Sequence, residues 1–347
     1  MSPLRHAFSL RVLKRLRLFL LWLGAFYTAW LIILLQGDNL AAAIHQWRIA
    51  VAMALGSYFA GSTPMGGGTV GFPFLVLLFD QPASVGRNFS LAVQSVGMVS
   101  ASIFIFVTRR TLAWSILSPA LIASLITTPL ALAFIAPYAP PLLVKLLFAV
   151  IWASFGVMHF VRLREITAMH GHKTASPRLD LALGVSVGLV GGILSAITGV
   201  GIDMLIYAVL VTLLRTDLKI AIPTSVVIMA FTSLVGITSS RLLGQVEPEV
   251  FPLWLAAAPV VALGAPFGAL VVHFMPRKPT LLIVSALCIG QYIWTLIDER
   301  VTGWPLLLSL FGVLAFNALF HIMYRAGESL AARNGPAPHA VAPTPSI

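Results

Sequence analysis

The sequence predicts an all-α protein that crosses a lipid bilayer many times. Of its 347 residues, 59% are hydrophobic and only 10% are charged, and the mean hydropathy is +0.97. A soluble domain carries about 25% charged residues, so this composition cannot build a water-exposed surface. Most of the apolar runs have about the 20 residues that cross hydrocarbon once as a helix. The expected fold class is therefore a polytopic membrane protein.

Ten apolar runs can be delimited, and two of them are unusual. The runs are 18–35, 49–79, 88–107, 114–136, 142–161, 181–214, 218–238, 250–272, 281–297 and 305–324. The runs 49–79 and 181–214 are about half as long again as a single crossing requires, and glycines interrupt both. The first interruption extends from Gly61 to Gly68, and the second from Gly191 to Asp203.

The Lys and Arg residues indicate how the two interrupted runs lie in the membrane. If each run crosses once, thirteen basic residues lie inside and nine outside. If each run enters, turns at its glycines and leaves by the same face, seventeen lie inside and five outside. Because cytoplasmic loops carry an excess of Lys and Arg, the sequence favours re-entrant hairpins.

The hairpins would enter from opposite faces, and three helices follow each of them. This predicts two inverted four-segment repeats, a recurring plan of secondary transporters. Ser62 and its neighbouring glycines match Ser195 and its glycines at an offset of 133, and Ser90 falls opposite Ser225 after a two-residue shift. The similarity is weak alone, but it agrees with the charge count.

The expected organisation surrounds these repeats with additional segments. Its parts are a basic cytoplasmic N-terminus (1–17), an extra transmembrane helix and loop (18–44), the first repeat (45–161), a cytoplasmic linker (162–180), the second repeat (181–300), an extra transmembrane helix (301–324) and a cytoplasmic, disordered tail (325–347). Whether the N-terminal helix is retained or cleaved is left open, although it is longer than the apolar region of a typical signal peptide.

The glycine breaks predict a binding site for an anion. Breaks free backbone N–H and C=O groups, which are costly in hydrocarbon unless they line a cavity or bind something. The start of a half-helix favours negative charge, so two such ends would form an anion site near the midplane. The alternative is close helix packing through small residues. The candidate substrate-binding residues are Ser62, Thr63, Gly66, Gly67, Gly68, Asn88, Ser90, Gln94, Ser195, Thr198, Gly199, Gly201, Thr224 and Ser225.

Each polar candidate also has a structural interpretation. The hydroxyls beside the breaks can bond to a nearby helix carbonyl instead of an anion. Asp203 is the only acidic residue well inside an apolar run, and an intramembrane carboxylate is a functional candidate for coupling to a proton or Na⁺. Its alternative is a hydrogen bond to backbone freed at Gly199 to Gly201. His159 lies near a predicted cytoplasmic end and is interpreted as interfacial.

Several other classes of function are not expected. The sequence contains no HExxH, GxSxG or Walker-type motif, so neither an enzyme activity nor a cofactor is predicted. The single cysteine, Cys288, excludes an internal disulfide and a cysteine-built metal site. The net charge of +11 comes from basic residues in short loops, which membrane orientation explains without nucleic acid as a partner.

Two stretches resemble the sulfite exporter TauE/SafE family. They are Gly61 to Pro73 with the segment Arg87 to Leu91, and Gly192 to Asp203 with the segment Ala221 to Ser225. The resemblance covers roughly residues 45–300. It implies a permease of the bacterial inner membrane for sulfite, sulfoacetate or related sulfur-containing anions. Two departures bear on the substrate: Ile206 stands where the first half has Pro73, and the first half lacks the Thr-Ser pair.

We therefore expect a secondary transporter of a small anion, a sulfur oxyanion or organosulfonate, that works by alternating access. Both termini would be cytoplasmic. The expected partners are the anionic substrate, the lipid bilayer and a coupling proton or Na⁺, and a homo-oligomer is left open. The alternatives are a passive anion channel on the same fold, a membrane enzyme acting on lipid, and an assembly partner of another membrane complex.

Overall fold

The computed structural model describes residues 10–65, 68–169, 176–271 and 277–333, and within these ranges the chain is helical with no strand. The all-α fold class is confirmed. The elements are α2 (Leu10–Leu34), α3 (Asn39–His45), α4 (Trp47–Ser62), α5 (Gly68–Pro73), a π-helical turn (Phe74–Leu78), α6 (Ala83–Val107), α7 (Trp114–Phe134), a 3₁₀ turn (Ala136–Tyr138), α8 (Pro141–Thr167), α9 (Pro177–Thr198), α10 (Ile202–Ala208), a second π-helical turn (Val209–Leu213), α11 (Leu218–Leu242), α12 (Val250–Val271), α13 (Arg277–Asp298) and α14 (Trp304–Arg333).

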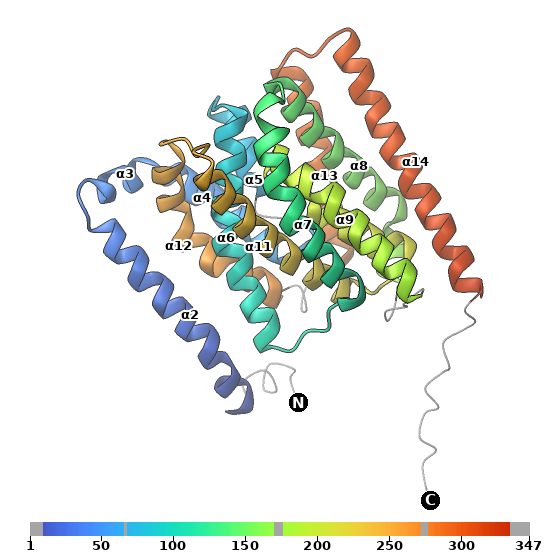
Figure 1. Ribbon diagram of the computed structural model, residues 1–347, viewed down its shortest axis with the longest axis horizontal. Helices are drawn as coiled ribbons and strands as arrows, with labels where there is room; N and C mark the ends of the chain where they lie inside the picture. Colours follow the sequence, from blue (N-terminus) through green and yellow to red (C-terminus); the bar gives the residue numbers. More distant parts are fainter. Residues whose placement is uncertain (1–9, 66–67, 170–175, 272–276, 334–347) are drawn as a thin grey trace, which may run out of the picture.

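Nine of the described helices are long and apolar enough to cross a bilayer: α2, α6 to α9 and α11 to α14. Helices α2 and α14 lie at opposite flanks of the molecule, and the start of α2 and the end of α14 lie at the same end (Figure 1). Only 11% of the apolar window of each of these two helices is buried, so their leucines are available to lipid. The multi-pass membrane architecture is thereby confirmed.

Both predicted breaks occur where the glycines stand. The first separates α4 from α5, and Gly66 and Gly67 lie outside the described residues. The second separates α9 from α10, where Gly199 has φ +83° and Gly201 has φ +115°. These left-handed values are accessible to glycine at no steric cost, which explains why glycine stands at both positions. The placement of each broken segment as a re-entrant hairpin stays a prediction.

The two halves share backbone features at one constant sequence offset. The π-helical turns Phe74–Leu78 and Val209–Leu213 define this offset. Asp80 and Arg215 have the same separation, and both have φ +51° shortly after these turns. Left-handed residues with that separation also follow α6 and α11, at Arg109 (φ +54°) and Gly244 (φ +68°). The same local geometry therefore recurs through both halves.

The offset between the π-helical turns corrects the alignment of the breaks that the sequence suggested. With this offset, Thr63 corresponds to Thr198, and each hydroxyl donates to the carbonyl four residues earlier. Ser90 then corresponds to Ser225 directly, so no two-residue shift is needed between the breaks and these serines. The glycines misled the alignment, because the offset of 133 pairs Gly66 with Gly199, whereas the offset of the π-helical turns pairs it with Gly201.

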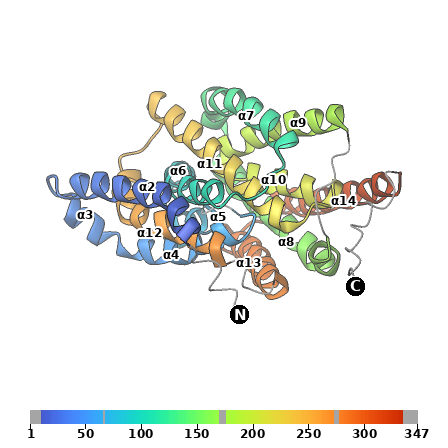
Figure 2. The ribbon, with the colours of Figure 1, turned by 90° about the horizontal axis from the view of Figure 1, so that it is seen from below.

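The halves exchange packing partners. Helix α4 packs against α12 of the second half, and α9 packs against α7 of the first half. Figure 2 shows these two pairs on either side of α6 and α11, which also pack together. Small residues permit the close approach: a Cβ at Gly61 would overlap the carbonyl oxygen of Ala265, and one at Gly188 would lie 2.5 Å from that of Ala120.

Some helix ends differ from the expected boundaries. The expected linker 162–180 is helical at both ends, because α8 continues to Thr167 and α9 already begins at Pro177. Ser176 caps α9 by accepting a hydrogen bond from the backbone N–H of Leu179 (3.2 Å), and proline at the first helical position suits that start. Helix α14 likewise continues past residue 324 to Arg333.

The two broken segments also differ in the length of their first arm. Helix α4 has 16 residues and α9 has 22. At 1.5 Å per residue these lengths are about 24 Å and about 33 Å. The two arms are therefore not equivalent in length, although the features beyond each break correspond.

Candidate functional site

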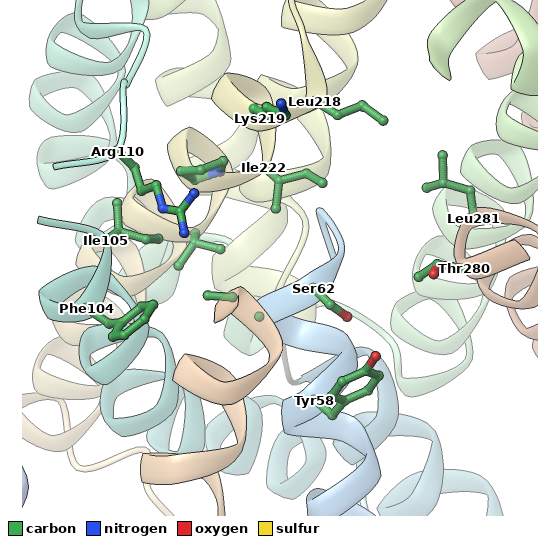
Figure 3. Close-up of a pocket in the computed structure, with 14 residues that line it drawn as sticks. Tyr58, Ser62, Phe104, Ile105, Arg110, Leu218, Lys219, Ile222, Thr280 and Leu281 are labelled. Carbon is green, nitrogen blue, oxygen red and sulfur yellow. The ribbon is translucent and has the colours of Figure 1, made fainter. Parts of the chain in front are cut away.

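A cavity of about 80 Å³ lies at the end of α4, beside the first break (Figure 3). This is several times the roughly 10–15 Å³ that one buried water requires. Residues from five helices and one loop line it: Tyr58, Gly61, Ser62, Phe104, Ile105, Arg110, Leu218, Lys219, Ile222, Pro223, Val226, Ala269, Thr280 and Leu281. Most of the lining is apolar, so the few polar groups define what the cavity can bind.

The polar groups of this cavity suit an anion. Two are cations, Arg110 and Lys219, and three carry hydroxyls, Tyr58, Ser62 and Thr280; no carboxylate occurs among the described lining residues. Figure 3 shows the Arg110 side chain extending into the space between α6 and α11. Burial lowers the pKa of the Arg110 guanidinium from its ordinary value, yet a guanidinium stays charged in proteins. The cavity therefore carries positive charge.

A second hollow of about 440 Å³ lies at the mouth of this cavity and shares Arg110 and Lys219 with it. Arg109 adds a third cation there, and Asp217 is the single acidic residue among the described residues that line it. The Asp217 carboxylate accepts a hydrogen bond from the backbone N–H of Lys219 (2.9 Å). The approach to the cavity is thus net positive, a field that attracts anions.

The predicted residues at the first break have different surroundings. Ser62 lines the cavity, and its hydroxyl makes a long contact of 3.5 Å to the carbonyl of Phe59. Thr63 is buried, and its hydroxyl donates to the same carbonyl at 2.6 Å. Gly68 begins α5, whereas Gly66 and Gly67 lie outside the described residues.

At the second break, the structure brings α6 and the predicted glycine together. Gln94 donates through Nε2 to the carbonyls of Ser90 (2.9 Å) and Gly199 (3.0 Å). The hydroxyls of Ser90 and Ser195 are buried and have no hydrogen-bond partner within the described chain. Thr198 instead donates to the helix carbonyl of Leu194 (2.9 Å), which is the structural alternative.

Thr224 and Ser225 lie on α11 but do not line the cavity; their neighbours Ile222, Pro223 and Val226 do. The Thr224 hydroxyl donates to a helix carbonyl (2.7 Å) and accepts from the backbone N–H preceding α7 (3.1 Å). The Ser225 hydroxyl donates to the carbonyl of Ile222 (2.8 Å). In this conformation both hydroxyls are committed to backbone groups.

Asp203 and His159 are both buried. One carboxylate oxygen of Asp203 accepts a hydrogen bond from the backbone N–H of Gly201 (3.1 Å), so it satisfies backbone that the break frees. The interfacial interpretation of His159 is wrong: its Nδ1 lies 2.9 Å from the carbonyl of Phe155, and its Nε2 lies 2.9 Å from the hydroxyl of Tyr207. This pair links α8 to α10, one helical turn from Asp203.

The sequence interpretation missed four polar residues of the cavity: Arg110, Lys219, Tyr58 and Thr280. The two cations occur in predicted cytoplasmic loops, where the orientation rule already explained them. Only the fold shows that the loop before α7 lies against the start of α11, where the backbone N–H of Ala113 meets Thr224. In the sequence alone, Arg110 has no local signal that distinguishes it from an ordinary loop cation.

The fold and the cavity together define a polytopic helical membrane protein with glycine-broken segments and a positively charged internal site. A family model described as "Sulfite exporter TauE/SafE" matches residues 48–295. The chain therefore belongs to the sulfite exporter TauE/SafE family of membrane transporters, which confirms the resemblance. The match includes both broken segments and leaves α2, α3 and α14 outside. No curated protein and no solved structure matches the chain.

Proposed function

We propose that this protein is a secondary transporter of a small sulfur-containing anion, a sulfur oxyanion or organosulfonate such as sulfite or sulfoacetate. The observation that carries the proposal is the cavity at the first break, with its two cations, three hydroxyls and apolar walls. Arg110 is half-buried and Lys219 is exposed, so the two cations give the entrance of the cavity a positive field that attracts anions. Sulfite and sulfonate groups present negatively charged oxygens, which guanidinium, ammonium and hydroxyl donors bind well.

At the opposite end of the molecule, hydrogen bonds join α6 to the loop between α11 and α12 and close that end, which supports alternating access. We call the three residues that make these bonds, Asn88, Gln245 and Glu247, the latch. Asn88 donates through its amide nitrogen to the carbonyl of Gln245 (2.6 Å) and to the carboxylate of Glu247 (2.8 Å). Gln245, the counterpart of Arg110 in the second half, donates in turn to the carbonyl of Leu132 at the end of α7 (3.1 Å). We name the two ends of the molecule the Arg110 end and the Glu247 end.

A fold with matching halves, open at one end and closed at the other, suits a carrier that exchanges these states. The closed Glu247 end favours a carrier over a passive channel, which requires a continuous path. The orientation rule places the Arg110 end in the cytoplasm, with both termini on that side. In this arrangement the two repeats are inverted, and each broken segment re-enters the membrane.

The coupling ion is assigned to Asp203 as part of the same proposal. Its carboxylate is fully buried beside the second break and already bonds the N–H of Gly201. A carboxylate in this position can bind a proton or Na⁺ and transmit the change to the break through that bond. The ion then alters the backbone of the second break, which is the counterpart of the break beside the anion cavity.

The test is uptake into proteoliposomes. Purified protein should accumulate at least one of sulfite, sulfate, thiosulfate or sulfoacetate, and an imposed proton or Na⁺ gradient should increase the accumulation. Arg110→Gln should reduce flux about tenfold or more, since a hydrogen bond that involves a charged group contributes about 1.5–3 kcal/mol. The control is Arg241→Gln, which removes an exposed cation far from the cavity. The proposal fails if the wild type moves none of these anions, or if both variants behave alike.

A further inference from the structure

A buried arginine lies at the closed Glu247 end. Arg87 on α6 is 7% exposed, and its Nε has no hydrogen-bond partner within the described chain. A cation removed from water needs a negative partner. The carboxylate of Glu247 is available for this role, because Asn88, the residue after Arg87, donates to it through its amide nitrogen (2.8 Å). Glu247 therefore brings an anion to Arg87 from the loop between α11 and α12.

More polar atoms than one carboxylate can satisfy are buried around this place. The Oγ of Ser90, the Oε1 of Gln94, the Oγ1 of Thr128 and the Oγ of Ser195 all lack hydrogen-bond partners within the described chain. Native structures leave few buried polar atoms unsatisfied, so a group of them requires an explanation such as a missing water, ion or ligand.

These atoms lie along the part of α9 that leads to the second break. A Cβ at Gly199 would lie 2.6 Å from the carbonyl oxygen of Arg87 and 3.0 Å from the Cβ of Ser90. One at Gly192 would lie 3.1 Å from the Oγ1 of Thr128. The polar atoms of α6, α7 and α9 thus lie along the last two turns of α9, before the glycine that ends it.

The position is also the counterpart of the cavity at the Arg110 end. Ile222 lines that cavity, and Arg87 corresponds to Ile222 at the offset that relates the two π-helical turns. Each end therefore has a basic residue beside its break, although the residue comes from a loop at one end and from a helix at the other. A basic residue near each break indicates the same kind of ligand at both ends.

We propose that Arg87 is the centre of a second site for the transported anion, at the Glu247 end, and that the Glu247 carboxylate occupies this site while that end is closed. A carboxylate and a sulfonate both present charged oxygens to the same donors. When the loop carrying Glu247 moves away, the incoming anion replaces the carboxylate, and Ser90, Thr128 and Ser195 supply further polar contacts. This inference rests on the proposed transport function.

The first experiment tests the latch without any substrate. The chain has one cysteine, so Cys288→Ala with Ser90→Cys gives a single reporter behind the latch. Its rate of modification by a membrane-impermeant methanethiosulfonate, added at the Glu247 end, is measured with Glu247→Gln or Glu249→Gln. Glu249 is an exposed residue of the same loop and provides the matched control.

Glu247→Gln should increase the rate about tenfold or more, because it removes the charge attraction that keeps the end closed. Glu249→Gln should leave the rate unchanged. If Ser90→Cys fails to insert, Thr128→Cys is the reporter. Equal rates in all three backgrounds overturn the latch.

The second experiment tests the site by measuring KM from each face in vesicles of opposite orientation, with sulfite and sulfoacetate as probes. Arg87→Gln should raise KM at the Glu247 face about tenfold, and Glu247→Gln should lower it because its carboxylate no longer competes. KM at the Arg110 face should remain within about twofold for either variant. Equal changes at both faces overturn the assignment of Arg87. If the wild type moves neither anion, the proposed function fails, whereas the accessibility measurement still decides the latch.

Discussion

The two glycines of the second break differ in what surrounds them, and this difference yields a quantitative prediction. Gly199 (φ +83°) and Gly201 (φ +115°) both have left-handed backbone. A Cβ at Gly201 meets only the side chain of Leu194, at 3.6 Å, which is ordinary contact. A Cβ at Gly199 would lie 2.6 Å from the carbonyl oxygen of Arg87, so helix α6 would have to move.

The magnitudes follow from these two situations. Gly201→Ala carries backbone strain alone, which costs of order 1–3 kcal/mol. Gly199→Ala carries similar strain and an overpacked contact with backbone, which adds about 1–3 kcal/mol. We therefore expect a lower thermal midpoint in detergent for Gly201→Ala than for wild type, and a midpoint lower again by several degrees for Gly199→Ala.

The assay heats the purified variants and uses size-exclusion chromatography to measure the fraction of folded protein that remains at each temperature. Flux is measured with the same preparations. Gly199→Ala should also reduce transport more than Gly201→Ala, since it separates α6 from the second break. If the two variants are equally stable, or if Gly201→Ala is the worse, then contact with α6 does not limit residue 199 and the reasoning is wrong.

Three further predictions follow from single contacts. Asp203→Asn removes the charge but keeps an oxygen that can accept a hydrogen bond from Gly201. Exchange of the anion without a gradient should therefore persist, whereas accumulation driven by a gradient should be lost. If the variant still accumulates the anion with the gradient, Asp203 does not couple transport to the ion. Tyr207→Phe removes the bond to His159 and should lower the stability by about 1 kcal/mol, measured as a shift of the thermal midpoint; a shift of zero would show that the pair contributes nothing. The methyl group of Gly61→Ala would overlap a backbone carbonyl oxygen of α12, so this variant should not be recovered as monodisperse protein. A normal yield of monodisperse protein would refute this prediction.

Much of the fold could be predicted because the bilayer imposes strong rules on sequence. Apolar length identifies crossing helices, and a glycine inside an apolar run identifies a break. The breaks at Gly66 to Gly68 and at Gly199 to Gly201 were found in this way. Asp203 could be identified because a carboxylate is conspicuous inside an apolar run.

The details of the sites depend on contacts between distant residues and could not be predicted. Asn88 and Glu247 are 159 residues apart, and no local pattern indicates that they bond. Arg110 looks like an ordinary loop cation until α11 is placed beside it. The π-helical turns are equally hidden, since the stretch Phe74–Leu78 is simply an apolar run of five residues in the sequence.

The exchange of packing partners between the halves also constrains how the protein is made. Gly61 on α4 reaches its contact with Ala265 on α12 only after about 200 further residues are synthesised. At about 5–20 residues per second this takes roughly 10–40 s. During that time α4 lacks the helix that later packs against its Gly61 face. We expect this interval to be the stage of biogenesis at which the chain is most exposed to membrane quality-control proteases.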